Sequence, residues 1–68
     1  MDEQTFNLGI RKVLKRFGVA AQREIEKAVD TAMARGEIGG HETLGVKIEL
    51  TIPDAGLDFT IEDTIDLA

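Results

Sequence analysis

The apolar residues of this chain change their spacing once, near residue 42, and that change limits the folds available to it. Before residue 42, apolar side chains recur every three or four positions, which is the period of an amphipathic helix. After it, they alternate with polar side chains, which is the period of a strand with one apolar face. Helical and strand segments are therefore separate in sequence, and the pattern predicts an α+β fold.

The first helical pattern predicts a helix over residues 3–17. Asp2 suits the N-cap position, and Gly18 can adopt the left-handed conformation that ends many helices. The apolar side chains of this segment share one face roughly 100° wide. They are Phe6, Ile10, Val13, Leu14 and Phe17.

The second pattern predicts a helix over residues 21–35 that ends at Gly36. Its apolar stripe consists of Ile25, Ala28, Val29, Ala32 and Met33. Its start is poorly capped, because Ala20 and Ala21 stand where Ser, Thr or Asp would accept free backbone N–H groups. Ala21→Ser is therefore expected to raise stability by about 1 kcal/mol.

The strand pattern predicts an antiparallel hairpin with strands at residues 44–52 and 57–67, joined by a turn at residues 53–56. In the register that this turn implies, Ile48 faces Ile61, and Lys47 meets Glu62 on the polar face. Asp63 then falls opposite Val46 on the apolar face. We expect a bulge or bend near residues 62–64 to turn the Asp63 side chain away from the apolar face.

Together these elements predict one domain over residues 1–68, in the order α-α-β-β, with both helices packed on one face of the hairpin. The side chains expected to form its core are Phe6, Ile10, Val13, Leu14, Phe17, Ile25, Val29, Met33, Ile48, Leu50, Phe59 and Ile61.

A chain of 68 residues buries only a thin core, and without cysteine it has no disulfide to support that core. Self-association is therefore the remaining way in which this thin core could be stabilised. A two-stranded sheet consists of edges, so pairing across a twofold axis would give a four-stranded sheet and a homodimer. The alternative is a monomer whose helices cover the hairpin.

The charges divide unevenly along the chain. Residues 1–41 hold seven Lys or Arg and six Asp or Glu, for a net charge of +1. Residues 42–68 hold one Lys and seven Asp or Glu, for a net charge of −6. General nucleic-acid affinity is not expected from this balance.

Four cations form a local basic patch on the predicted first helix, opposite its apolar stripe: Arg11, Lys12, Lys15 and Arg16. One interpretation is structural, because cations near a helix C-terminus are favoured by the helix dipole. The other is functional, with an anionic surface neutralising the patch. That surface could belong to another protein, to a second copy or to nucleic acid, and these four residues are the candidate partner-binding site.

No residue set predicts catalysis or a bound cofactor. His41 is the only histidine and lies in a glycine-flanked loop without fixed partners. The strand carboxylates point alternately outward and do not converge on a cation site. The glycines at positions 36, 39 and 40 match no phosphate-binding fingerprint. We expect a protein that is not an enzyme and that holds no metal, cofactor or small-molecule ligand.

A nucleic-acid-binding regulator is the alternative function. Two helices around Gly18 followed by a hairpin resemble a truncated winged-helix domain, with the second helix presenting residues such as Gln22 and Arg23. The hairpin in the position of the wing is acidic, however, and would repel a phosphate backbone.

Several segments of the chain resemble a family of short uncharacterised bacterial proteins, a domain of unknown function. The segments are Phe6-Asn7, Ile10-Arg11-Lys12, Leu14-Lys15, Gly18-Val19, the run from Gln22 to Val29, and Glu42-Thr43-Leu44. The resemblance covers most of the chain. It implies one domain and a bacterial origin, and it implies no catalytic residues.

The expected location is the cytoplasm, because no apolar run approaches the roughly 20 residues of a membrane span and the chain opens on acidic residues. The sequence therefore predicts a small interaction module or accessory subunit that self-associates.

Overall fold

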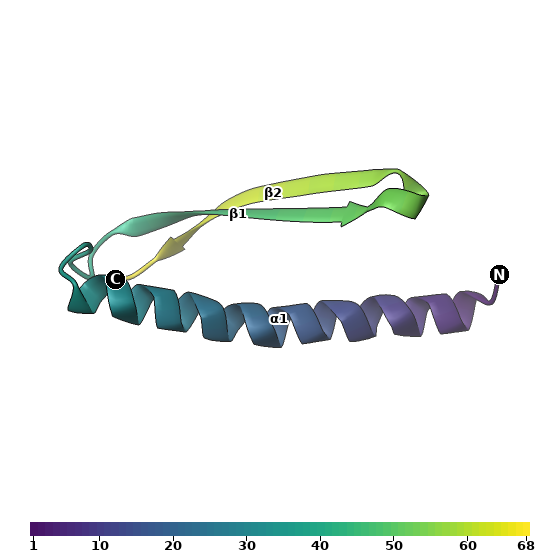
Figure 1. Ribbon diagram of the computed structural model, residues 1–68, viewed down its shortest axis with the longest axis horizontal. Coiled ribbons are helices and arrows are strands. Elements are labelled where there is room, and N and C mark those ends of the chain that lie inside the picture. The colour runs from purple at the N-terminus through teal and green to yellow at the C-terminus, as the bar shows by residue number, and fades with distance from the viewer. The chain divides into compact units, whose positions relative to one another are not determined.

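One long helix followed by a β-hairpin makes up the structure, a computed structural model that describes residues 1–68 (Figure 1). Helix α1 spans Glu3–Ala34, and strands β1 and β2 span Thr43–Ile52 and Leu57–Asp66 around a 3₁₀ turn at Pro53–Ala55. The predicted α+β class and the hairpin are confirmed. The chain divides into two compact units, Met1–Arg35 and Gly36–Ala68, and each is described by itself.

The helical part is one helix, so the prediction of two helices at residues 3–17 and 21–35 is wrong. Gly18 does not adopt the left-handed conformation, since only Gly36, Gly40 and Gly56 have positive φ. A glycine inside a helix costs about 1 kcal/mol. A break there would leave several backbone groups without partners, and neither Ala20 nor Ala21 could cap them. Continuing the helix is the cheaper solution.

Both ends of α1 lie close to the predicted positions and are capped. Asp2 Oδ1 accepts hydrogen bonds from the backbone N–H groups of Gln4 (2.9 Å) and Thr5 (3.1 Å). These bonds, that from Thr5 foremost, lower the pKa of the Asp2 carboxyl. At the other end Gly36 adopts φ +71°, the left-handed conformation that stops the helix.

The hairpin has the predicted register without interruption. Ile52 pairs with Leu57, Leu50 with Phe59 and Ile48 with Ile61. The expected bulge near residues 62–64 is absent, because Val46 pairs directly with Asp63 and the ladder continues to Thr43 and Asp66. A bulge would serve to move Asp63 out of an apolar layer. Here the Asp63 side chain is exposed, so no rearrangement is needed.

A carboxylate organises the connector between the two units. Glu42 accepts hydrogen bonds from three successive backbone N–H groups, those of Gly39 (2.7 Å), Gly40 (2.9 Å) and His41 (3.0 Å). These donors, with Gly39 first, lower the pKa of the Glu42 carboxyl. The arrangement is an anion-binding concavity of backbone amides that is filled by the chain's own side chain.

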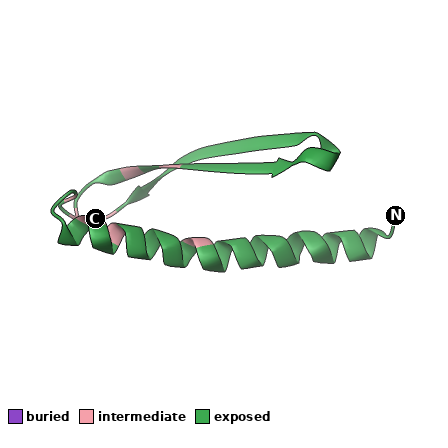
Figure 2. Ribbon diagram, viewed as in Figure 1, coloured by how far each residue is buried: buried purple, intermediate pink, exposed green.

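No residue is buried within either unit, so neither unit forms the predicted twelve-residue core by itself (Figure 2). The least exposed residues are of intermediate exposure: Ala21, Val29, Ala32, Ile38, Gly40, Leu44, Val46 and Leu67. A single helix and a two-stranded hairpin each form only one layer, and one layer cannot enclose a side chain. Covering their apolar faces requires further packing.

Replacing Gly18 by Ala tests whether α1 is continuous. A Cβ at Gly18 would meet no atom within 4 Å, so Gly18→Ala should stabilise the helix by about 1 kcal/mol through its better helix preference. Ala21→Ser, now inside a helix, should lower stability slightly instead of raising it. The readout is thermal unfolding followed by circular dichroism at one fixed protein concentration.

Gly36→Ala is the matched control, because Gly36 also has open space around it but holds φ +71°. It should lower the melting temperature, since a Cβ is strained in that conformation. A lower melting temperature for Gly18→Ala would instead mean that Gly18 terminates a helix and that α1 is broken there.

Acid should release the connector through Glu42. Its folded-state pKa lies below the unfolded value, so its contribution to stability is present above the unfolded pKa and is lost as pH falls through the folded pKa. In an NMR titration, the amide signals of Gly39, Gly40 and His41 should shift together with a midpoint below that of an ordinary glutamate. Glu42→Gln should abolish this transition, and Glu37→Gln should leave it intact. A midpoint at or above the ordinary value would contradict the hydrogen-bonded arrangement.

Candidate interaction surfaces

The apolar face of α1 has no covering element within its own unit. Large side chains on it are about half exposed, including Phe6 (52%), Leu14 (52%) and Phe17 (50%). At 100° per residue, the stripe of the C-terminal half around Ile25 is displaced by roughly 80° from that of the N-terminal half. The face therefore winds gradually around one continuous helix.

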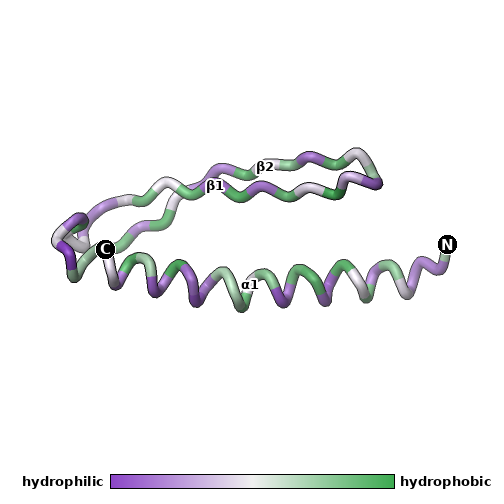
Figure 3. Tube along the Cα trace, in the orientation of Figure 1, coloured by the Kyte–Doolittle hydropathy of each residue, from purple (hydrophilic) through white to green (hydrophobic).

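The hairpin also has one apolar face. Because the register is continuous, even-numbered residues of β1 and odd-numbered residues of β2 share it. Its apolar members are Leu44, Val46, Ile48, Leu50, Ile52, Leu57, Phe59, Ile61 and Ile65. Figure 3 shows the alternation of apolar and polar residues along both strands. Asp63 is the single charged residue on this face, and its carboxylate accepts a hydrogen bond from the Thr64 N–H (2.7 Å).

The opposite face of the hairpin is polar and carries a net negative charge. Lys47 is its only cation, and its Nζ lies 3.1 Å from Glu49 on the same strand. The predicted opposition of Lys47 and Glu62 is present in the register, but the ion pair forms with Glu49. Near the open end of the hairpin, the Thr43 hydroxyl donates to Asp66 Oδ1 (2.9 Å). β2 contributes three acids and no cation to this face, namely Asp58, Glu62 and Asp66, and carries a fourth acid, Asp63, on the apolar face.

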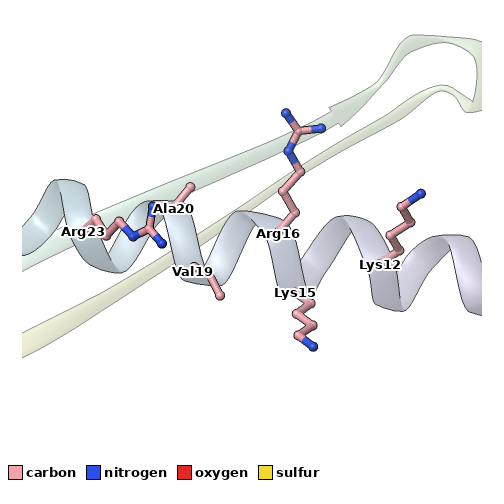
Figure 4. A pocket seen from close by; sticks show the side chains of 6 residues that line it. All are labelled: Lys12, Lys15, Arg16, Val19, Ala20 and Arg23. Carbon is pink, nitrogen blue, oxygen red and sulfur yellow. The ribbon is translucent and has the colours of Figure 1, made fainter.

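The basic face of α1 comprises the four predicted site residues and Arg23. The structure places Arg11, Lys12, Lys15 and Arg16 on two successive turns, and none has a carboxylate within 4.0 Å. No acidic residue occurs from Gln4 to Arg23. Lys12, Lys15, Arg16 and Arg23 line a shallow depression together with Val19 and Ala20 (Figure 4).

A continuous α1 removes one explanation for these cations. Arg16 lies 18 residues before the last helical residue, Ala34. The favourable effect of the helix dipole on cations falls off within the last turn, so it does not reach the basic face. The like-charged pairs Arg11/Lys15 and Lys12/Arg16 are each unfavourable by about 0.2–0.5 kcal/mol in an isolated helix. The basic face is therefore an uncompensated cluster.

Sequence reasoning missed two residues here. Arg23 was assigned to a second helix, although it follows Arg16 by seven residues and therefore lies on nearly the same side of an uninterrupted helix. Glu42 was not singled out, although it follows two glycines whose amides are free to turn toward a carboxylate. His41 contributes its backbone N–H to Glu42, and no cluster of three or more His, Cys, Asp or Glu side chains forms a metal site.

The helix does not combine the length and the apolar character that crossing a bilayer requires.

Comparison with known proteins gives a family and nothing more specific. No curated protein and no solved structure matches the chain. One family model does match, over residues 1–68. The resemblance seen in the sequence is thereby confirmed, and the chain belongs to DUF6494, a family of unknown function.

Proposed function

We propose that this chain is a small non-enzymatic interaction module of the bacterial cytoplasm that works as a homodimer and binds an anionic partner protein through the basic face of α1. The observation that carries the proposal is the combination of no buried residue with 17 exposed large hydrophobic side chains. Monomeric soluble proteins rarely expose contiguous apolar patches larger than a few hundred Å². Each of the two apolar faces of this chain therefore needs a surface that covers it.

The dimensions of the elements favour a second copy. A 32-residue helix is about 48 Å long, and a 10-residue strand spans about 33 Å. One hairpin has two strands about 4.8 Å apart, so it forms a narrow layer about 10 Å wide. A four-stranded sheet from two hairpins would be about 19 Å wide, which matches two helices packed 8–10 Å apart. Two copies can thus form two complete layers.

Association at these faces is also favoured by the hydrophobic effect, at about 25 cal/mol for each Å² of apolar surface removed from water. A layer of two helices over four strands would bury side chains from both faces, including the core predicted from the sequence. The proposed dimer has two helices, one α1 from each copy. A chain with two helices would have given a dimer with four.

The basic face would remain outside such a dimer, because it lies on the side of α1 opposite the stripe that includes Phe17. Arg11, Lys12, Lys15 and Arg16 have no acidic residue three or four positions away on α1 and are not explained by the helix dipole. A carboxylate-rich surface of another protein would neutralise them, and Val19 and Ala20 would give that contact an apolar centre. The accessory-subunit role of the proposal rests on this surface.

Nucleic acid is the alternative anionic partner. A helix-turn-helix reader needs two helices joined by a turn, and α1 has no turn at Gly18. Phosphate contacts by the basic face alone would still be opposed by the acidic hairpin. The absence of a second helix makes an acidic protein the better candidate.

Light scattering over a hundredfold dilution tests the homodimer. The mass should be twice the 7.4 kDa of one chain. Phe59→Asp places a charge on the apolar face of the hairpin and should shift the mass toward one chain. Thr60→Asp, its neighbour on the polar face, is the control and should leave the mass unchanged. A wild-type protein of one-chain mass that still unfolds cooperatively would refute self-association.

The basic face is tested by reversing two of its charges. Arg11→Glu with Lys15→Glu should abolish binding of fluorescent poly-glutamate at low salt, while the solution mass stays the same. Arg35→Glu, at the end of α1 and outside the basic face, should retain binding. Equal binding by the double variant would remove the basic face from the proposal. A mobility shift of duplex DNA that the double variant loses would favour the nucleic-acid alternative.

A further inference from the structure

One edge of the hairpin is suited to pairing with a copy of itself. The N–H of Leu67 bonds to the carbonyl of Glu42 (3.0 Å), so the backbone groups of Glu42 point toward β2. In an antiparallel strand these groups alternate in direction, and the register is continuous from Thr43 to Ile52. The backbone N–H and C=O groups that point away from β2 are therefore those of the odd-numbered residues of β1: Thr43, Gly45, Lys47, Glu49 and Thr51.

The charges of β1 select one register for self-pairing. Lys47 and Glu49 are its only charged residues, and they flank Ile48. In an antiparallel pair with a twofold axis through Ile48, each Lys47 faces Glu49 of the other copy. Cross-strand pairs of opposite charge are favourable, and like charges directly opposite are unfavourable.

Neighbouring registers lack this match. Moving the axis to Lys47 sets Lys47 against Lys47, and moving it to Glu49 sets Glu49 against Glu49. A shift that pairs odd with even residues would place apolar side chains against polar ones on both faces. The axis through Ile48 also aligns the remaining apolar residues, with Val46 opposite Leu50 and Leu44 opposite Ile52.

The other edge does not fit a second copy. β2 carries four acids and no cation, so two β2 strands side by side would bring eight carboxylates together. Acidic residues on an edge strand discourage pairing with other chains. β2 thus has the character of an outer edge and β1 that of an inner one.

Resting on the homodimer proposed above, we infer that two copies pair β1 with β1 about a twofold axis through Ile48. The interface is held by two Lys47–Glu49 ion pairs and the hydrogen bonds of the odd-numbered residues. The sheet has the strand order β2-β1-β1-β2 and is antiparallel throughout. Its apolar face is continuous across the axis, and Asp63 lies on each outer strand, away from the axis.

Cysteine cross-linking tests this pairing directly, because the chain has no cysteine of its own. The two Ile48 residues would form a non-hydrogen-bonded pair with Cα atoms about 4.5 Å apart, within the range of a disulfide. Ile48→Cys should therefore form a covalent dimer under mild oxidation. Ile61→Cys is the matched control, since Ile61 pairs with Ile48 on the same face but its two copies would lie about 14 Å apart. Cross-linking of Ile61→Cys, or of neither variant, would overturn the pairing.

Charge exchange gives a second test that requires no disulfide. Lys47→Glu alone should raise the dimer dissociation constant about tenfold, since two attractive pairs become repulsive. Glu49→Lys alone should do the same, and the double variant should restore the wild-type value. Mixing the two single variants should give a heterodimer in preference to either homodimer, because both cross-strand pairs are then of opposite charge.

The two proposals fail in different ways. A wild-type protein that light scattering finds to be monomeric would refute the homodimer itself. A dimer that lacks either the Ile48→Cys cross-link or the charge-exchange pattern would refute only the β1 pairing and its register.

Discussion

Every other feature of this structure depends on one constraint: the chain forms two amphipathic units, and neither can bury its own apolar face. α1 is a single helix and the hairpin has two strands, so each presents one layer to water. Hydrophobic burial is the main favourable contribution to folding, and a chain of 68 residues has little of it to lose. In the proposed dimer, folding and association are therefore linked.

Local interactions then decide how the units end and connect. Asp2 caps the start of α1, Gly36 stops it, and Glu42 ties three connector amides to the start of β1. These interactions are all exposed, so they shape the units without supplying much stability.

Charge is also divided between the two units. The basic face lies on α1, and the hairpin carries six acidic residues against one Lys, which leaves two surfaces of opposite sign available for different contacts.

The hairpin register could be predicted because alternation and the turn at residues 53–56 together fix it, whereas the bulge expected near residues 62–64 is absent. The helix was predicted less well, because Gly18 was interpreted as the residue that ends a first helix. The missing cap at Ala20 and Ala21 was the indication that no helix starts there. The four site residues were visible as a cluster, but Arg23 and the failure of the dipole explanation follow only from a continuous α1. The predicted core could not be checked within either unit, because it needs layers that neither unit has.

The most direct test of the account is the helical circular dichroism signal at 222 nm, measured as the protein is diluted through its dimer dissociation constant. If folding depends on association, helicity should fall with dilution and follow the decrease in mass. Helicity that stays constant in a protein already reduced to single chains would contradict the account, because α1 would then be stable without any partner for its apolar face.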